Sequence, residues 1–242
     1  MPVAASSRSP VLLEEGREGG WWLRGWASHR IVAATTSRQI NAATLLQAAG
    51  GGVVSIEAEQ VHGGSVAIIP GLVGRVHIPV PGCDALITNA SGVALLIRTA
   101  DCLPIFFADA SRGVVGLAHA GWRGLAAQLP ARVVAACRHA YQSRAEELQV
   151  AIGPAIRRCS YEVGPEFAAR FGPFIGVQEG RRTCDLVGVA VDQLRRCGVD
   201  PARIVDTQRC TACETTRWFS LRREGSSTGR LTSIIMVRPS VG

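Results

Sequence analysis

The chain has 242 residues, 47% of them hydrophobic, and its formal net charge at pH 7 is +7. This length can bury a large core, and no linker divides it. We therefore predict a single domain over residues 1–242, with residues 1–20 as a flexible or peripheral N-terminal segment. No apolar run reaches the roughly 18 residues that a membrane helix needs, and an export signal is lacking, so we expect a cytoplasmic protein without membrane contact.

The charge and the cysteines exclude further classes. Every basic residue is an arginine, and the arginine pairs are scattered rather than clustered with aromatic residues. Clustered basic runs are typical of nucleic-acid binding, so we expect no nucleic-acid partner, whereas arginine suits a phosphate-bearing substrate. The eight cysteines lie in a long chain without a secretion signal, which indicates reduced thiols rather than a disulfide framework.

Periodicity predicts the elements in chain order. A strand at 31–36 precedes a helix at 41–49, with Asn41 as N-cap and Gly50 at its end. Strands follow at 53–56, 65–70, 85–88, 93–99, 105–109 and 114–119. One apolar helical face runs from Leu125 to Tyr141, then a strand lies at 150–152, helices at 165–171 and 186–197, and strands at 217–221 and 231–237. Mixed strands with unevenly spaced helices favour an α+β fold.

Three metal-ligand residue types stand at the ends of apolar runs. Cys102 and His119 follow consecutive runs, and His62 closes an earlier one. Three protein ligands with a fourth position left for water or substrate are typical of catalytic zinc. The residues are far apart in sequence, so spacing alone leaves the alternative that each histidine is a hydrogen-bonded core or turn residue.

Six segments surround these residues: EQVHG at 59–63, TADCLP at 99–104, HAGWRG at 119–124, IGPAI at 152–156, CSYEVG at 159–164 and RCT at 209–211. In this order they resemble the laccase-domain family, also called the purine nucleoside phosphorylase, polyphenol oxidase or peptidoglycan editing factor family. The resemblance runs from about residue 31 to 237. It implies a single-domain layered α/β/β/α sandwich with mixed β-sheets.

The resemblance also implies a chemistry. It places the zinc ligands on His62, Cys102 and His119, and it implies phosphorolysis or deamination of adenosine, inosine, guanosine or methylthioadenosine. The partners would be a purine nucleoside and phosphate, with a homodimer left open. Asp84 matches another family position, although an aspartate before a strand also caps turns.

Further site roles are hypotheses from residue chemistry. Asp101 is a candidate catalytic residue, as a general base or as the partner of a ligand histidine. Arg123, and more weakly Arg38, are candidate substrate-binding residues that pair with phosphate. Members of the family usually carry a longer loop before the first helix, whereas this chain passes from Arg38 almost directly to Asn41. That loop would line the pocket, so the departure bears on substrate identity.

Three other functions remain as alternatives. Cys102 with His119 as base would make a cysteine-nucleophile amidase or peptidase acting on a peptidoglycan precursor. A degenerate member would bind a ligand without catalysis. A copper polyphenol oxidase ranks below zinc chemistry, because multicopper sites use many His-x-His pairs and the five histidines form none. Cys210 and Cys213 have the spacing of a zinc knuckle, but no second pair lies nearby, and we expect Cys159 to pack near the site without ligating.

Overall fold

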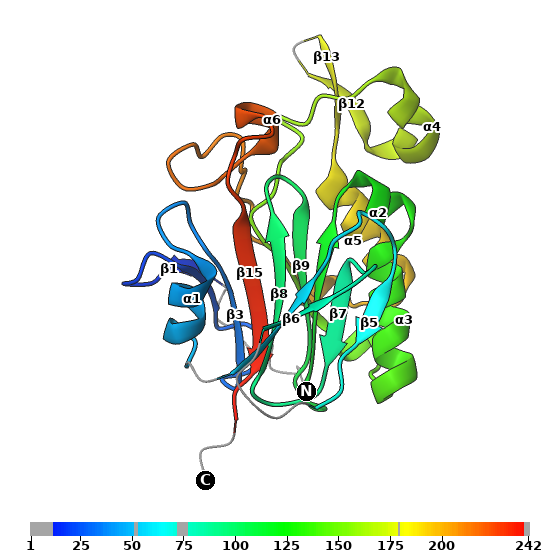
Figure 1. Ribbon diagram of the computed structural model, residues 1–242. Helices are drawn as coiled ribbons and strands as arrows, with labels where there is room; N and C mark the ends of the chain where they lie inside the picture. Colours follow the sequence, from blue (N-terminus) through cyan, green and yellow to red (C-terminus); the bar gives the residue numbers. More distant parts are fainter. Residues whose placement is uncertain (1–11, 51–52, 72–76, 179, 240–242) are drawn as a thin grey trace, which may run out of the picture.

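The computed structural model describes residues 12–50, 53–71, 77–178 and 180–239, and its main feature is two large mixed β-sheets (Figure 1). The first has the spatial order β1 (Leu12–Glu15), β2 (Trp21–Arg24), β3 (Ile31–Thr35), β15 (Leu231–Val237), β8 (Val93–Thr99), β4 (Val54–Ala58) and β6 (His77–Val80). The second has the order β14 (Ile204–Asp206), β11 (Gln149–Ile152), β9 (Leu103–Asp109), β10 (Val114–Ala120), β7 (Ala85–Thr88) and β5 (Val66–Ile68). A separate hairpin pairs β12 (Ile175–Gln178) with β13 (Arg181–Cys184).

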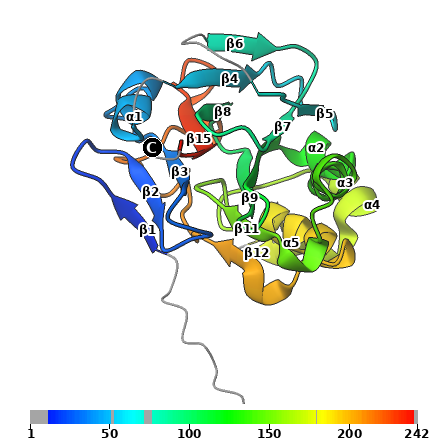
Figure 2. The same cartoon turned by 90° about the horizontal axis from the view of Figure 1, so that it is seen from below.

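Helices cover the outer faces of both sheets, as the view from below shows (Figure 2). The helix α1 (Ala42–Ala48) packs on the first sheet, and α2 (Trp122–Ala126), α3 (Leu129–Tyr141) and α5 (Leu186–Arg196) pack on the second. Two short helices, α4 (Ala168–Phe171) and α6 (Leu221–Glu224), lie at the end of the molecule that carries the β12–β13 hairpin (Figure 1). The result is the predicted α+β fold with α/β/β/α layers.

Side-chain alternation along the strands builds these layers. In β8, Leu95 and Ile97 point into the core between the sheets, while Leu96 points toward α1. In β9, Phe106 faces the same inter-sheet core, and Phe107 faces the helices on the other side. Because successive side chains of a strand point to opposite faces, a strand buried on both faces is apolar throughout. This explains why the central strands appear in the sequence as continuous apolar runs.

Most of the predicted central elements are confirmed, with local corrections. Asn41 caps α1 by accepting a hydrogen bond from Thr44 N at 3.0 Å. The predicted apolar helix divides into α2 and α3, because Gln128 has a left-handed backbone (φ 60°) and Pro130 lies in the first turn of α3. The predicted strand at 217–221 is wrong: residues 217–220 run from a turn into irregular chain that buries Trp218 against Trp21, and Leu221 begins α6.

The edges of the fold hold the strands that periodicity missed. The strand β1 pairs antiparallel with β2 at the edge of the first sheet, and its Leu-Leu-Glu-Glu sequence has no alternation to indicate a strand. Thus residues 12–15 of the predicted N-terminal segment belong to a sheet, and residues 1–11 lie outside the described residues. The single-domain organisation over 1–242 stays a prediction. No helix in the described ranges has the length and apolarity to cross a membrane.

Candidate metal centre and its pocket

The fold brings His62, Cys102 and His119 together. One potential ligand atom from each of the three side chains lies within 4.8 Å of those of the other two. The two imidazole rings meet edge to face, with centroids 4.8 Å apart and an interplanar angle of 85°. His119 is buried, Cys102 is half-buried and His62 is exposed, so the cluster opens toward solvent on one side.

Strand pairing explains this convergence. His119, near the end of β10, pairs in register with Pro104 near the start of β9, and Cys102 immediately precedes β9. The strand β7 pairs with β10 on the other side and begins directly after Asp84. Asp84 and His119 therefore continue the alternating strand positions whose apolar side chains fill the core between the sheets.

Asp84 holds both histidines in place from a fully buried position. Its carboxylate accepts hydrogen bonds from His62 N at 2.9 Å, from Gly63 N at 2.6 Å and from His119 Nδ1 at 2.9 Å. The first two bonds stabilise a turn in which His62 has a left-handed backbone, with φ 60°. The third occupies Nδ1 of His119 and leaves Nε2 for a metal, the usual arrangement of a carboxylate that orients a ligand histidine.

Electrostatics favour a thiolate within the cluster. Burial opposes ionisation of Cys102, but hydrogen bonds with His119 and His62 lower the pKa of its thiol to about 7. Burial likewise opposes the charged form of His119, but hydrogen bonds with Asp84 and Cys102 raise its pKa to about 9. A metal ion would displace the protons of the Cys102 thiol and the His119 imidazole, because it binds thiolate and neutral imidazole.

The backbone leaves room for this donor set. Gly121 faces the cluster, and a Cβ at that position would lie 2.8 Å from Cys102 Sγ and 3.7 Å from His62 Cδ2. Any larger residue would displace the sulfur. Two imidazoles and one thiolate on a cradle that only glycine permits therefore fit a borderline-soft cation such as zinc.

A cavity of about 380 Å³ adjoins the cluster. This volume lies within the range of small-molecule sites. Two guanidinium groups, those of Arg123 and Arg222, combine there with largely apolar walls. The other lining residues are His62, Ala100, Asp101, Cys102, Gly121, Trp122, Ile156, Tyr161, Leu186 and Leu221. The cavity thus combines a metal-type cluster, positive charge and an apolar surface.

Asp101 lines this cavity in a left-handed backbone conformation (φ 90°). Its Oδ1 accepts a hydrogen bond from Thr211 Oγ1 and its Oδ2 accepts one from Arg222 N, both at 2.7 Å. Asp84, rather than Asp101, binds a ligand-type histidine. Asp101 therefore connects the pocket wall to α6 through hydrogen bonds. Its predicted catalytic role stays a prediction.

The two predicted substrate-binding arginines differ in their surroundings. Arg123 lines the cavity, and its guanidinium lies 4.7 Å from the centroid of the Trp122 ring. Arg38 does not line the cavity: it forms an ion pair with Glu224 and lies over the ring of Phe219. Substrate binding by Arg38 stays a prediction. Arg222, which the sequence presented as one of several scattered arginine pairs, lines the cavity, and no local pattern marked it.

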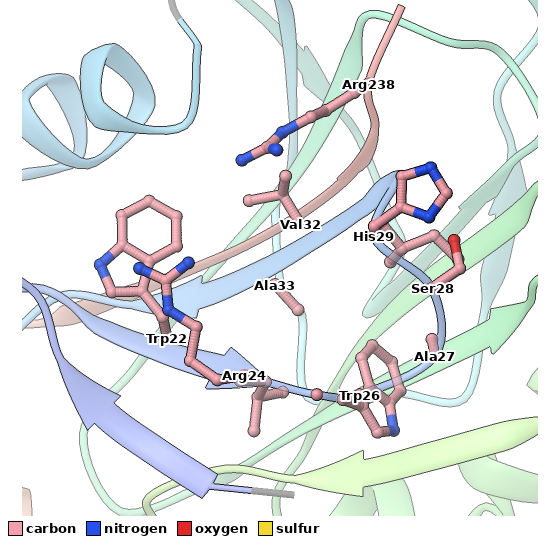
Figure 3. A pocket seen from close by; sticks show the side chains of 12 residues that line it. Trp22, Arg24, Trp26, Ala27, Ser28, His29, Val32, Ala33 and Arg238 are labelled. Carbon is pink, nitrogen blue, oxygen red and sulfur yellow. The ribbon is translucent and has the colours of Figure 1, made fainter.

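A second cavity, of about 430 Å³, lies on the β2–β3 hairpin, where Arg24 lies beside Trp22 (Figure 3). Arg238 and His29 are its other charged or titratable lining residues, and its lining includes no carboxylate or thiol. Without a carboxylate, a thiol or a second histidine, this cavity lacks the groups that the first one combines. The cluster of His62, Cys102 and His119 is therefore the candidate functional site.

Comparison with known proteins places this chain in a family. The model of the family described as multi-copper polyphenol oxidoreductase laccase matches residues 32–238. The chain belongs to this family. The chain is 37% identical over 165 residues to the purine nucleoside phosphorylase YlmD of Geobacillus stearothermophilus, a match that covers 64% of this chain and 60% of that protein. It is 36% identical over 159 residues to adenosine deaminase RL5 from an unknown prokaryotic organism, covering 62% and 60% respectively.

The fold of this laccase-family protein matches a solved relative over nearly its whole length. The crystal structure of YlmD from Geobacillus stearothermophilus superposes with a TM-score of 0.83 at 27% identity, covering 95% of this chain and 100% of that one. In sequence, the aligned segments span about 60% of the two curated relatives. The family and the layered fold are thus shown.

Proposed function

We propose that this protein is a zinc-dependent purine nucleoside phosphorylase, with adenosine deaminase activity at the same site. The observation that carries the proposal is the cluster of His62, Cys102 and His119 on a cavity that also holds Arg123 and Arg222. The substrates would be adenosine, inosine, guanosine or methylthioadenosine, with phosphate as the second substrate. The names of the relatives support this class of reaction.

Zinc is the metal that the donor set favours. The described cluster offers two imidazoles and one thiolate, whereas multicopper oxidases require many more imidazoles than the five in this chain. When bound, zinc supplies a Lewis acid that stabilises negative charge developing on an oxygen. Asp84 would keep His119 in the correct tautomer and orientation for ligation.

The remaining pocket residues would bind the two substrates. The guanidinium of Arg123 lies over the Trp122 ring and has no hydrogen bond or ion pair among the described residues, so it is available for a phosphate oxygen. Arg222 is partly engaged, because it donates to Glu162 O at 2.8 Å. Apolar side chains such as Ile156, Leu186 and Leu221 suit the faces of a purine. In phosphorolysis a phosphate oxygen bonds to ribose C1′, the glycosidic C–N bond breaks, and the purine leaves with a proton.

The test is a nucleoside panel assayed with and without phosphate, before and after metal removal. We expect release of free base from inosine only with phosphate, loss of that release after treatment with a chelator, and recovery on adding zinc. Conversion of adenosine to inosine would show the deaminase activity. Protein that binds zinc and turns over no nucleoside would contradict the proposal and favour a non-catalytic binding member of the family.

One arrangement favours a second candidate function. Asp84, His119 and Cys102 form a chain in which the carboxylate orients the imidazole and the imidazole hydrogen-bonds the thiol. This is the geometry of a cysteine nucleophile with its base, which would make the protein an amidase or peptidase on a peptidoglycan precursor. Activity that survives chelation but is lost on thiol alkylation would support this candidate against the metal enzyme.

Arg123→Gln is expected to weaken phosphate use selectively. A hydrogen bond to a charged group contributes about 1.5–3 kcal/mol, so its loss should raise the KM for phosphate about tenfold to a hundredfold and leave the zinc content unchanged. Steady-state kinetics at varied phosphate measures the effect. The matched control is Arg196→Gln, an arginine paired with Asp192 at the end of α5. An unchanged phosphate KM in Arg123→Gln would remove this residue from the binding site.

A further inference from the structure

Three cysteines outside the pocket form a second cluster. Cys159 follows β11 after a loop, and Cys210 and Cys213 lie in the turn between β14 and α6. The structure brings Cys159 to the other two: its Sγ lies 3.7 Å from that of Cys210 and 3.6 Å from that of Cys213. All three sulfurs lie within 4.8 Å of one another, and all three thiols are free. Cys159 thus supplies a nearby thiol that the spacing of Cys210 and Cys213 did not predict.

The sulfur spacing matches that of a thiolate metal site. With zinc–sulfur bonds of about 2.3 Å and tetrahedral angles, two ligating sulfurs lie about 3.75 Å apart. Both sulfur–sulfur separations from Cys159 are close to this value. Ser160 Oγ lies 3.2 Å from Cys213 Sγ, 3.5 Å from Cys159 Sγ and 3.8 Å from Cys210 Sγ, so an oxygen stands on the fourth side of the cluster.

Backbone hydrogen bonds hold the two segments in this arrangement independently of a metal. Ala155 N donates to Arg209 O at 3.2 Å, and Thr211 N donates to Ala155 O at 3.1 Å. These two bonds join the segment around Ala155, which leads to Cys159, to the segment that contains Cys210. Cys210 is buried, while Cys159 and Cys213 are exposed. The site is therefore preformed and accessible from solvent.

From this geometry we propose that Cys159, Cys210 and Cys213 bind a second zinc ion, with an oxygen from Ser160 or water as the fourth ligand. The site is structural in position, because it joins two segments that build the pocket wall. Tyr161, two residues after Cys159, lines the cavity, and Thr211, which follows Cys210, donates to Asp101 at 2.7 Å. Zinc at this cluster would hold the wall beside the first site without contacting its substrates.

The test is the zinc content of purified protein and of single variants. We expect about two equivalents in the wild type and about one in Cys159→Ser and in Cys213→Ser, both of which replace exposed residues. Cys102→Ala should also retain about one equivalent, at the second site. Cys197→Ser, which alters a half-buried cysteine outside both clusters, is the matched control and should keep two.

A second measurement examines the ligands directly. In the Cys102→Ala protein loaded with cobalt(II), we expect near-ultraviolet sulfur-to-cobalt charge-transfer absorbance, reduced by adding Cys213→Ser. Unchanged zinc content in both serine variants, or a Cys210–Cys213 disulfide in protein purified with zinc, would overturn the proposal. If zinc is lost only in Cys102→Ala, the three-cysteine site is contradicted and the first site stands. If zinc is lost only in Cys213→Ser, the first site is contradicted and the three-cysteine site stands.

Discussion

Cys102→Ala is expected to abolish phosphate-dependent release of base from inosine and to remove the zinc of the pocket. The substitution deletes the only thiolate of the cluster and leaves two histidines, too few protein ligands for a catalytic zinc. Even the loss of a residue that merely orients a ligand weakens metal binding or activity about tenfold to a hundredfold, so loss of a ligand should exceed a hundredfold. Metal analysis and kcat/KM for inosine measure the two effects.

The control for this variant is Cys197→Ala, at the half-buried end of α5. It should keep both the metal and the activity, which separates a specific effect from general sensitivity to cysteine replacement. Circular dichroism should show the same fold for both variants, because Cys102 lies in a loop at the cavity rather than in a core strand. If Cys102→Ala kept its full zinc content and turnover, the metal assignment would be wrong.

Asp84→Asn is expected to lower zinc affinity about tenfold to a hundredfold and to reduce activity with it. The two carboxylate oxygens accept from three N–H donors, those of His62 N, Gly63 N and His119 Nδ1. An asparagine offers one acceptor oxygen, and its NH₂ group would face a donor. Leaving a buried donor unpaired also costs about 1–3 kcal/mol in the free energy of unfolding. Zinc titration and urea denaturation measure the two consequences.

Asp109→Asn provides a matched comparison. Asp109 is another buried carboxylate, and it accepts hydrogen bonds from Ser111 N and Arg112 N in the turn that follows β9, at the opposite end of that strand from Cys102. Its substitution should lower the free energy of unfolding by a similar amount and leave zinc affinity unchanged. Equal zinc affinities in the two variants would show that Asp84 acts on stability alone.

The central layers could be predicted because a strand that is buried on both faces has apolar residues at nearly every position. Strands such as β8, β9 and β10 are apolar at nearly every position, and α1 carries a recognisable cap in Asn41. The edge strand β1 and the segment 217–221 could not be predicted in this way. Trp218 and its neighbours have the composition of a strand, but Ser220 caps α6 by accepting from Arg223 N, and the tryptophan packs on Trp21 instead.

The candidate site likewise has residues that the sequence suggested and one whose role it did not indicate. Residue type and position after apolar runs made His62, Cys102 and His119 candidates, because metal chemistry restricts the side chains that can serve, and the family resemblance implied that they are the ligands. From the sequence, Asp101 was the candidate partner of a ligand histidine, whereas Asp84 holds that position in the structure; both are aspartates beside strands, so residue type does not distinguish them. The choice depends on the antiparallel register of β7 with β10, which brings Asp84 against His119.

The sequence by itself thus determined the family, the α+β class and the residue types of the metal-type cluster. Only the tertiary structure decided which groups meet: Asp84 with His119, Arg222 with the cavity, Arg38 with Glu224 and Cys159 with Cys210. The physical reason is that periodicity reports how each segment is buried against the core, whereas contacts between distant loops depend on strand register and crossing connections. The local sequence does not determine strand register or the path of these connections.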